Sequence, residues 1–134
     1  MPDFLHAVLV FAGYLGAAVA FTVLFLYVYT RLTPHREFEL IVVQHNVAAA
    51  VALGFSLIGF VIPLARAMAQ AVSIVEFATW GVVAFAVQLA AYGAARAAHP
   101  GLSEAIGGGS VASALWLGFV SLAAGLLSAA AMTG

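Results

Sequence analysis

The sequence predicts an all-α membrane protein whose four transmembrane helices form two parallel, same-topology helical-hairpin repeats. Of its 134 residues, 66% are hydrophobic and only 7% are charged, and the mean hydropathy is +1.17. About a quarter of the residues in a soluble domain are charged, so this composition excludes one. Four uncharged runs, 4–30, 40–65, 77–95 and 105–134, are each close to or above the roughly 20 residues that one bilayer crossing needs.

The second half of the sequence repeats the first. Pairs at an offset of 65, then 64 after one deletion, are Gly16 with Gly81, Tyr27 with Tyr92, Arg31 with Arg96, Glu39 with Glu104, Asn46 with Ser110, Gly54 with Gly118 and Phe55 with Phe119. Each repeat holds two spans, so both enter the membrane in the same sense, around a pseudo-two-fold axis along the membrane normal. We expect one integral membrane domain over 1–134, with repeat one at about 4–68 and repeat two at about 73–132.

The first helix is expected over about 4–32. Ala12, Gly16 and Ala20 are spaced four apart and form a small-residue stripe that suits close packing. The first run follows no positive n-region, so it is expected to be retained rather than cleaved as a signal peptide. Pro34 is expected to end this helix, because the residue before a proline avoids the α region. The polar segment 31–39 is then a loop.

The second helix, expected over about 40–64, organises the bundle. Small or polar residues form two stripes on it, Asn46, Ala50 and Gly54 on one side and Ala52, Ser56, Gly59 and Pro63 on the other. Helices in lipid associate through close backbone approach and a few hydrogen bonds. A helix with two such stripes is therefore expected inside the bundle, with Pro63 near its end, where a missing backbone bond costs least or produces a kink.

The third helix is expected over about 73–95 and is followed by a glycine-rich loop over 96–108. The fourth helix presents a long face of small residues for packing: Ser110, Ala114, Gly118, Ser121, Gly125 and Ser128. Together with the second helix, this gives a set of expected helix-packing residues: Ala50, Gly54, Gly59, Ala114, Gly118 and Gly125.

The arginines predict an orientation. Arg31, Arg36 and Arg96 fall in the first and third connections, whereas Arg66 alone lies at the second. The positive-inside rule then places the first and third connections in the cytoplasm and both termini in the periplasm.

Few polar residues are expected in the middle of the membrane: Thr22, Ser56, Gln88 and Ser121. None is ionisable, whereas coupled pumps usually keep an ionisable residue at this depth. The sequence therefore disfavours coupled transport and leaves passive flow open. Gln88 is the strongest of these polar residues, and it either bonds a neighbouring helix or contacts a substrate.

The cytoplasmic side collects groups of the kind that bind Zn²⁺ or another divalent ion: His35, Glu37, Glu39, His45, Asn46, His99 and Glu104. Their spacings match no metal motif, so we expect no metal site and no cofactor. A haem held by two histidines is also disfavoured, because His6 alone lies on the other side. The chain has no cysteine and no basic cluster, so neither a disulfide nor nucleic-acid binding is expected.

Two residues at the cytoplasmic end have open interpretations. Asn46 lies about one turn inside the second helix, where its amide needs partners, and it bonds a helix end or contacts a ligand. Ser110, near His45 and Glu104 by repeat symmetry, suggests hydrolysis only if a triad forms, and a helix-capping serine is commoner. The candidate ligand or pore contacts are therefore His45, Asn46, Ser110 and Gln88.

Several short motifs, in this order and at these distances, cover the whole chain: Thr33-Pro34-His35 with Glu37, Leu40-Ile41, Asn46 with Ala48-Ala49, Val61-Ile62-Pro63-Leu64, Ala71-Val72-Ser73-Ile74, Trp80-Gly81, Leu102-Ser103-Glu104 and Ala131-Met132-Thr133. Together they resemble domain of unknown function 350, the UPF0719 inner-membrane family, and within it the YjfL-like members. The resemblance implies a four-span bacterial inner-membrane protein of two duplicated hairpins with no established activity.

The resemblance also implies a setting. YjfL-like members are often encoded beside phage-shock-like and ATP-grasp, glutathionylspermidine-synthase-like proteins, which implies involvement in membrane stress. The family often shows His-Asn in the second repeat, as at His45-Asn46 in the first, whereas this chain has Gly109-Ser110 there. A symmetric site built from two asparagines is therefore not expected.

Taken together, these observations predict a non-enzymatic membrane protein that forms a homo-oligomer in the lipid bilayer and scaffolds or senses the envelope. The alternative is a small passive channel or transporter with its pore on the pseudo-two-fold axis. Asn46 and Ser110 would then lie at its cytoplasmic mouth, and Gly54 and Gly118 would line or close it.

Overall fold

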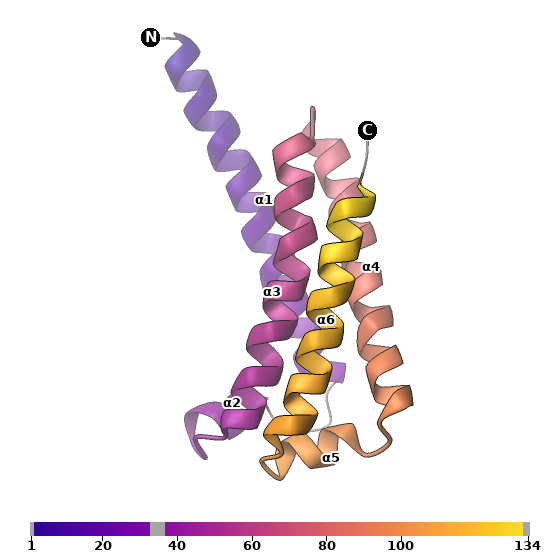
Figure 1. Cartoon of the computed structure of the whole chain (residues 1–134). Coiled ribbons are helices and arrows are strands. Elements are labelled where there is room, and N and C mark those ends of the chain that lie inside the picture. The colour runs from indigo at the N-terminus through magenta and orange to yellow at the C-terminus, as the bar shows by residue number, and fades with distance from the viewer. Residues whose placement is uncertain (1, 33–36, 133–134) are drawn as a thin grey trace.

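The computed structural model describes residues 2–32 and 37–132, which form six helices (Figure 1). They are α1 (Pro2–Leu32), α2 (Glu37–Val42), α3 (Val47–Gln70), α4 (Ile74–Ala98), α5 (Leu102–Gly107) and α6 (Val111–Ala131). Four of them, α1, α3, α4 and α6, are long and apolar enough to cross a membrane. The prediction of an all-α protein with four spans is therefore confirmed.

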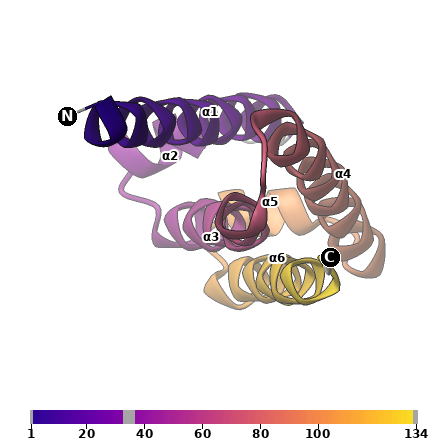
Figure 2. The ribbon, with the colours of Figure 1, turned by 90° about the horizontal axis from the view of Figure 1, so that it is seen from above.

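The long helices run up and down, so that both termini lie at one end of the bundle and α2 and α5 lie at the other (Figure 1). Seen from above, α3 lies between α1, α4 and α6 (Figure 2). Half of the residues in the most apolar stretch of α3 are buried, against 11% in α1, so α3 is the central helix and α1 is peripheral. The most extensive packing of α3 is against α6, which runs in the same direction as α3.

The second span differs from the expected 40–64 at both of its ends. Residues 37–42 form the separate short helix α2, and His45 then adopts a positive φ of 53°, so α3 begins only at Val47. At the other end the helix continues past Pro63 to Gln70. The third connection, expected as a loop, contains α5. The expected end of the first helix at Pro34 lies outside the described residues, as do His35 and Arg36.

The connections that lead into α3 and α6 have the same backbone geometry. His45 has a φ of 53° and Gly109, 64 residues later, a φ of 94°. The matching backbone hydrogen bonds are Val43 N–H to Glu39 O and Gly108 N–H to Glu104 O, both 2.9 Å, and Asn46 N–H to Leu40 O and Ser110 N–H to Ala105 O, 2.8 and 2.9 Å. A glycine tolerates a positive φ, whereas His45 adopts it at a steric cost.

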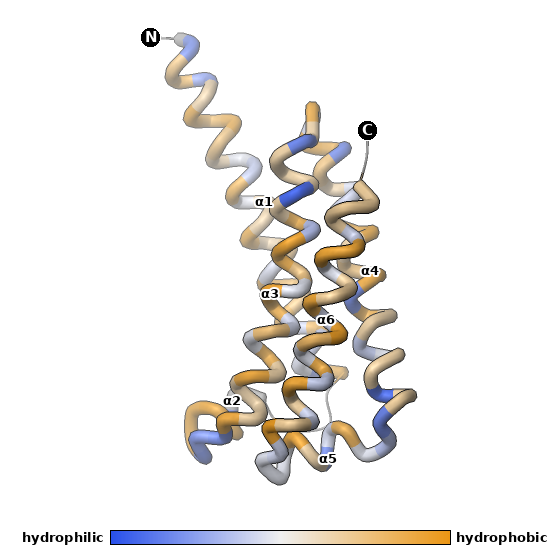
Figure 3. The backbone as a smooth tube through the Cα atoms, viewed as in Figure 1, coloured by the Kyte–Doolittle hydropathy of each residue, from blue (hydrophilic) through white to orange (hydrophobic). Residues whose placement is uncertain are grey.

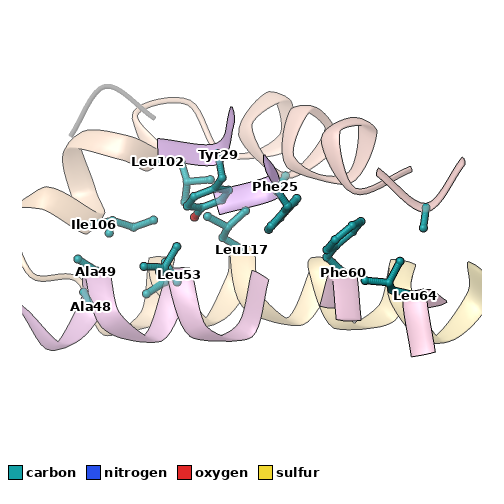
Figure 4. Packing of buried hydrophobic residues seen from close by; sticks show 14 of the residues in the cluster. Phe25, Tyr29, Ala48, Ala49, Leu53, Phe60, Leu64, Leu102, Ile106 and Leu117 are labelled. Carbon is teal, nitrogen blue, oxygen red and sulfur yellow. The ribbon is translucent and has the colours of Figure 1, made fainter. Parts of the chain in front are cut away.

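Aromatic rings hold the C-terminal half of α1 against the bundle. Phe25 of α1 stacks on Phe60 of α3 with ring centroids 4.7 Å apart; Figure 4 labels both residues. Tyr29 meets Tyr92 of α4 edge to face, with ring centroids 5.8 Å apart. The first third of α1, residues 3–13, is exposed throughout and projects away from the other helices (Figure 1). The tube coloured by hydropathy shows apolar residues along the spans and hydrophilic stretches mainly near their ends (Figure 3).

Candidate functional site

Gln88 lies in the middle of α4 and joins three helices. Its side chain is 2% exposed, and its Nε2 donates to the backbone oxygens of Gly59 in α3 at 2.9 Å and of Ser121 in α6 at 3.1 Å. Its Oε1 accepts a hydrogen bond of 2.6 Å from the Ser121 hydroxyl. Both ends of the amide are therefore bonded to the protein itself, as a buried polar group in a membrane requires.

Pro63 explains why Gln88 reaches Gly59. In an α-helix the carbonyl of residue 59 accepts from the N–H of residue 63, and proline has no N–H. The Gly59 carbonyl thus lacks its usual backbone donor, and an unsatisfied carbonyl inside a bilayer is costly. Nε2 of Gln88 takes the place of that donor, which allows α3 to continue through Pro63 to Gln70.

Glycines let α3 and α6 approach closely beside this polar contact. A Cβ added at Gly59 would lie 2.5 Å from the backbone oxygen of Ser121, and one added at Gly125 would collide with the carbonyl of Gly59. Further along, a Cβ at Gly118 would lie 2.7 Å from the Cβ of Phe55. No side chain larger than hydrogen fits at these three positions without movement of a helix.

The other small-residue stripe of α3 faces outward. Ala50 is exposed, and a Cβ built on Gly54 would meet no described atom within 4 Å apart from its chain neighbours and the adjoining backbone of α3 itself. This stripe lies in an apolar groove of about 350 Å³, which we call the α3 groove, lined by Val47, Ala50, Val51, Gly54, Phe55 and Ile58. The opposite stripe, which includes Ser56, Gly59 and Pro63, is buried in the bundle.

Asn46 is the N-cap of α3 rather than a residue one turn inside the helix. Its Oδ1 accepts from the backbone N–H of Ala49 at 3.0 Å. Its Nδ2 donates to the backbone oxygens of Ile106 at 3.3 Å and Gly107 at 3.1 Å, at the end of α5. The side chain therefore satisfies the start of one helix and the end of another, and it ties the first half of the chain to the second.

Ser110 is the N-cap of α6 and begins a chain of hydroxyl contacts. Its Oγ accepts from the Ser113 N–H at 3.2 Å and donates to the Ser113 hydroxyl at 3.0 Å. That hydroxyl lies 2.9 Å from Nε2 of His99, whose Nδ1 lies 3.1 Å from the Pro100 carbonyl. With the imidazole proton on Nδ1, His99 donates to Pro100 and accepts from Ser113, so every donor has an acceptor.

Sequence reasoning missed the contact between His99 and Ser113. A serine beside an imidazole is also the arrangement of an activated nucleophile, but Ser113 is only 8% exposed. Next to it, the indole N–H of Trp116 donates to the Ala95 carbonyl at 3.1 Å. Both contacts join the end of α4 to the start of α6, so the structure accounts for them as ties between these helices.

The remaining candidates at this end of the bundle lie near the surface. His45 is exposed between α2 and α3, and Glu104 is exposed in α5. Across residues 2–32 and 37–132, no three side chains of the types His, Cys, Asp and Glu gather closely enough to hold a metal ion.

Comparison with known proteins identifies a family and relatives of this chain. The family profile described as "Domain of Unknown Function (DUF350)" matches residues 3–132. The chain is 39% identical over 129 residues to the UPF0719 inner membrane protein YjfL of Escherichia coli (strain K12), a match that covers 96% of this chain and 97% of the relative. The protein of the same name from Escherichia coli O157:H7 matches equally. No solved structure matches the chain significantly.

Proposed function

The chain belongs to the DUF350 family of multi-pass inner-membrane proteins, and we propose that it is a non-enzymatic scaffold that works as a homo-oligomer in the bacterial inner membrane. The observation that carries this proposal is the bonding of Gln88. Transporters keep ionisable or polar side chains at mid-membrane depth that face a water-filled cavity or the substrate. Here both ends of the Gln88 amide form hydrogen bonds with Gly59 and Ser121, which favours a role in building the bundle.

We also propose that the bundle arose by duplication of one hairpin. The support is the pair of connections into α3 and α6, which share a positive φ, an N-cap and two backbone hydrogen bonds at offsets of 64 and 65 residues. Membrane insertion does not require the connections into α3 and α6 to share a backbone geometry, since a four-span bundle tolerates many loop geometries. The two halves are then related by an axis along the membrane normal.

We propose that both termini face the periplasm. Arg31 and Arg96 lie in the last turns of α1 and α4, at the end of the bundle that holds α2 and α5, whereas Arg66 lies toward the other end. This distribution supports a cytoplasmic position for α2 and α5. A C-terminal alkaline phosphatase fusion is expected to be active and a C-terminal fluorescent-protein fusion dark, and the reverse result would overturn this orientation.

The passive channel on the pseudo-two-fold axis is the second candidate, and the packing of one chain disfavours it. The space between α3 and α6 is filled where Phe55 covers Gly118 and where Gly59 meets Gly125. A pore at this place would require the two helices to separate. A scaffold needs no such opening, and the membrane-stress setting implied by the family resemblance gives it a cellular role.

Two measurements on purified protein test the proposal. Native mass spectrometry in mild detergent is expected to show a defined oligomer, and reconstituted vesicles are expected to stay impermeable to ions and small solutes. A monomer would contradict the scaffold. A solute flux into vesicles that contain the wild-type protein, absent from protein-free vesicles, would support the channel instead.

A further inference from the structure

We propose that a second copy of this chain occupies the α3 groove and places its own α6 there, repeating between copies the contact that α3 and α6 make within one chain. This inference rests on the proposed homo-oligomer and names its interface. The occupant follows from the proposed duplication, because the repeated hairpin carries a second glycine, Gly54, and a second phenylalanine, Phe119, which are less covered within the chain than Gly118 and Phe55.

Both α3 and α6 have a glycine face of this kind, but only the face on α6 packs against the other helix within the chain. In α6, Ala114 and Gly118 are buried, and the side chain of Phe55 lies against Gly118. Their equivalents in α3, 64 residues earlier, are Ala50 and Gly54. These two lie in the α3 groove, where a Cβ on Gly54 would meet no described atom within 4 Å apart from its chain neighbours and the adjoining backbone of α3 itself.

The phenylalanine side of the contact is also present twice. Phe55 of α3 lies on Gly118 within the chain. Its equivalent in α6 is Phe119, whose side chain is 55% exposed and whose ring centroid lies 5.9 Å from that of Phe55. One chain therefore presents both an open glycine groove and an exposed phenylalanine, and the contact between their equivalents is already seen inside the chain.

The directions of these faces allow a closed assembly. Consecutive residues of an α-helix point about 100° apart. Gly54 and Phe55 are consecutive in α3, and Gly118 and Phe119 are consecutive in α6, so each helix has a glycine face and a phenylalanine face in the same rotational order. In a ring of four helices in which α3 and α6 alternate, each helix contacts two neighbours through faces about 90° apart. Two copies related by a two-fold axis can form such a ring, in which every glycine face meets a phenylalanine face and the assembly is closed.

Two further features fit this occupant. The α3 groove continues the α3–α6 interface, because Phe55 lines the groove and also covers Gly118. In addition, α4 packs against both α3 and α6, whereas its equivalent α1, as far as it is described, packs against α3 without a comparable contact to any α6. An α6 from a second copy in the groove supplies α1 with that missing neighbour.

Disulfide trapping tests the interface directly, because the chain contains no cysteine. Gly54→Cys and Phe119→Cys are made in separate chains with different tags, co-expressed and oxidised in membranes. With one cysteine per chain, every disulfide joins two chains, and a linked pair carrying both tags is expected. Ile58→Cys, in the same groove, replaces Gly54→Cys in a second experiment with the same expected result.

The control pairs Gly54→Cys with Val23→Cys, an exposed position of α1. Val23 lies nine residues before the end of α1 and Gly54 seven residues after the start of α3, so the two positions have similar depths in the bundle. Linkage no greater than in this control, or equal linkage by Gly54→Cys alone, overturns the proposed interface. Native mass spectrometry tests the homo-oligomer separately from the interface through which it forms. An oligomer without linkage between the α3 groove and α6 refutes this interface and leaves the homo-oligomer standing, whereas a monomer refutes both.

Discussion

Replacing Gln88 with leucine is expected to destabilise the bundle, and replacing Pro63 with alanine in the same chain is expected to recover much of the loss. Leucine removes the donor that Gln88 gives to the Gly59 carbonyl and leaves that carbonyl without a partner. Alanine at position 63 restores a backbone N–H at the usual place for the same carbonyl. The two substitutions therefore act on one atom, and their effects are expected to be coupled.

The structure sets the size of this effect. Loss of a partner by a buried polar group costs about 1–3 kcal/mol, and side-chain hydrogen bonds measured in membranes are worth about 0.6 kcal/mol on average and up to about 1.7. The Ser121 carbonyl keeps its partner within α6, and the Ser121 hydroxyl turns to its own helix. The Gly59 carbonyl dominates, so we expect Gln88→Leu to cost about 1–2 kcal/mol and Pro63→Ala to recover about 1 kcal/mol.

A double-mutant cycle of unfolding free energies, measured in lipid bicelles for the wild type, both single variants and the double variant, gives the coupling. Gln44→Leu is the matched control, because Gln44 is exposed in the connection between α2 and α3, and its expected effect is within about 0.5 kcal/mol. Additive effects within about 0.5 kcal/mol would refute the reasoning, since they would mean that Gln88 does not replace the missing N–H of Pro63.

Three other predictions concern single positions. Gly118→Leu is expected to prevent folding because its Cβ would lie 2.7 Å from that of Phe55, whereas Gly54→Leu keeps the fold; equal melting curves by circular dichroism would contradict this difference. Asn46→Ala loses the cap and both bonds to α5 and is expected to cost about 1–3 kcal/mol of unfolding free energy. Asn46→Ser keeps the cap but loses the bonds to α5, so its unfolding free energy is expected to lie between those of the wild type and Asn46→Ala. A serine variant as stable as the wild type would show that the bonds to α5 contribute nothing. His45→Gly relieves a φ of 53° and is expected to raise the unfolding free energy by about 0.5–1 kcal/mol, and a loss of stability would point to a side-chain role for His45.

The spans were predictable because charged residues are rare enough to mark their ends, but the start of the second span was not. Leu40-Ile41-Val42-Val43 is as apolar as the helix that follows, so composition does not separate α2 from α3. The break depends on the positive φ of His45 and on the bonds from Asn46 to α5, 60 residues away in the sequence. A long-range contact of this kind leaves no local pattern.

The candidate site was predictable in its residue types and not in its partners. Gln88 is recognisable as a polar residue at mid-membrane depth, yet its acceptor depends on the crossing of α3, α4 and α6 at a carbonyl freed by Pro63. The two stripes of α3 were visible in the sequence, but only packing shows that Gly59 is buried and Gly54 is open. The pair of His99 and Ser113 was missed because their approach depends on the path of α5 between them.

Native mass spectrometry of the wild-type protein beside Gly54→Leu tests the central claim, assembly of copies through the α3 groove, most directly. We predict a defined oligomer for the wild type and a folded monomer for the variant, because leucine fills the groove without touching the packing inside one chain. A monomeric wild type would contradict the scaffold, and an unchanged oligomer in the variant would contradict the role of the groove.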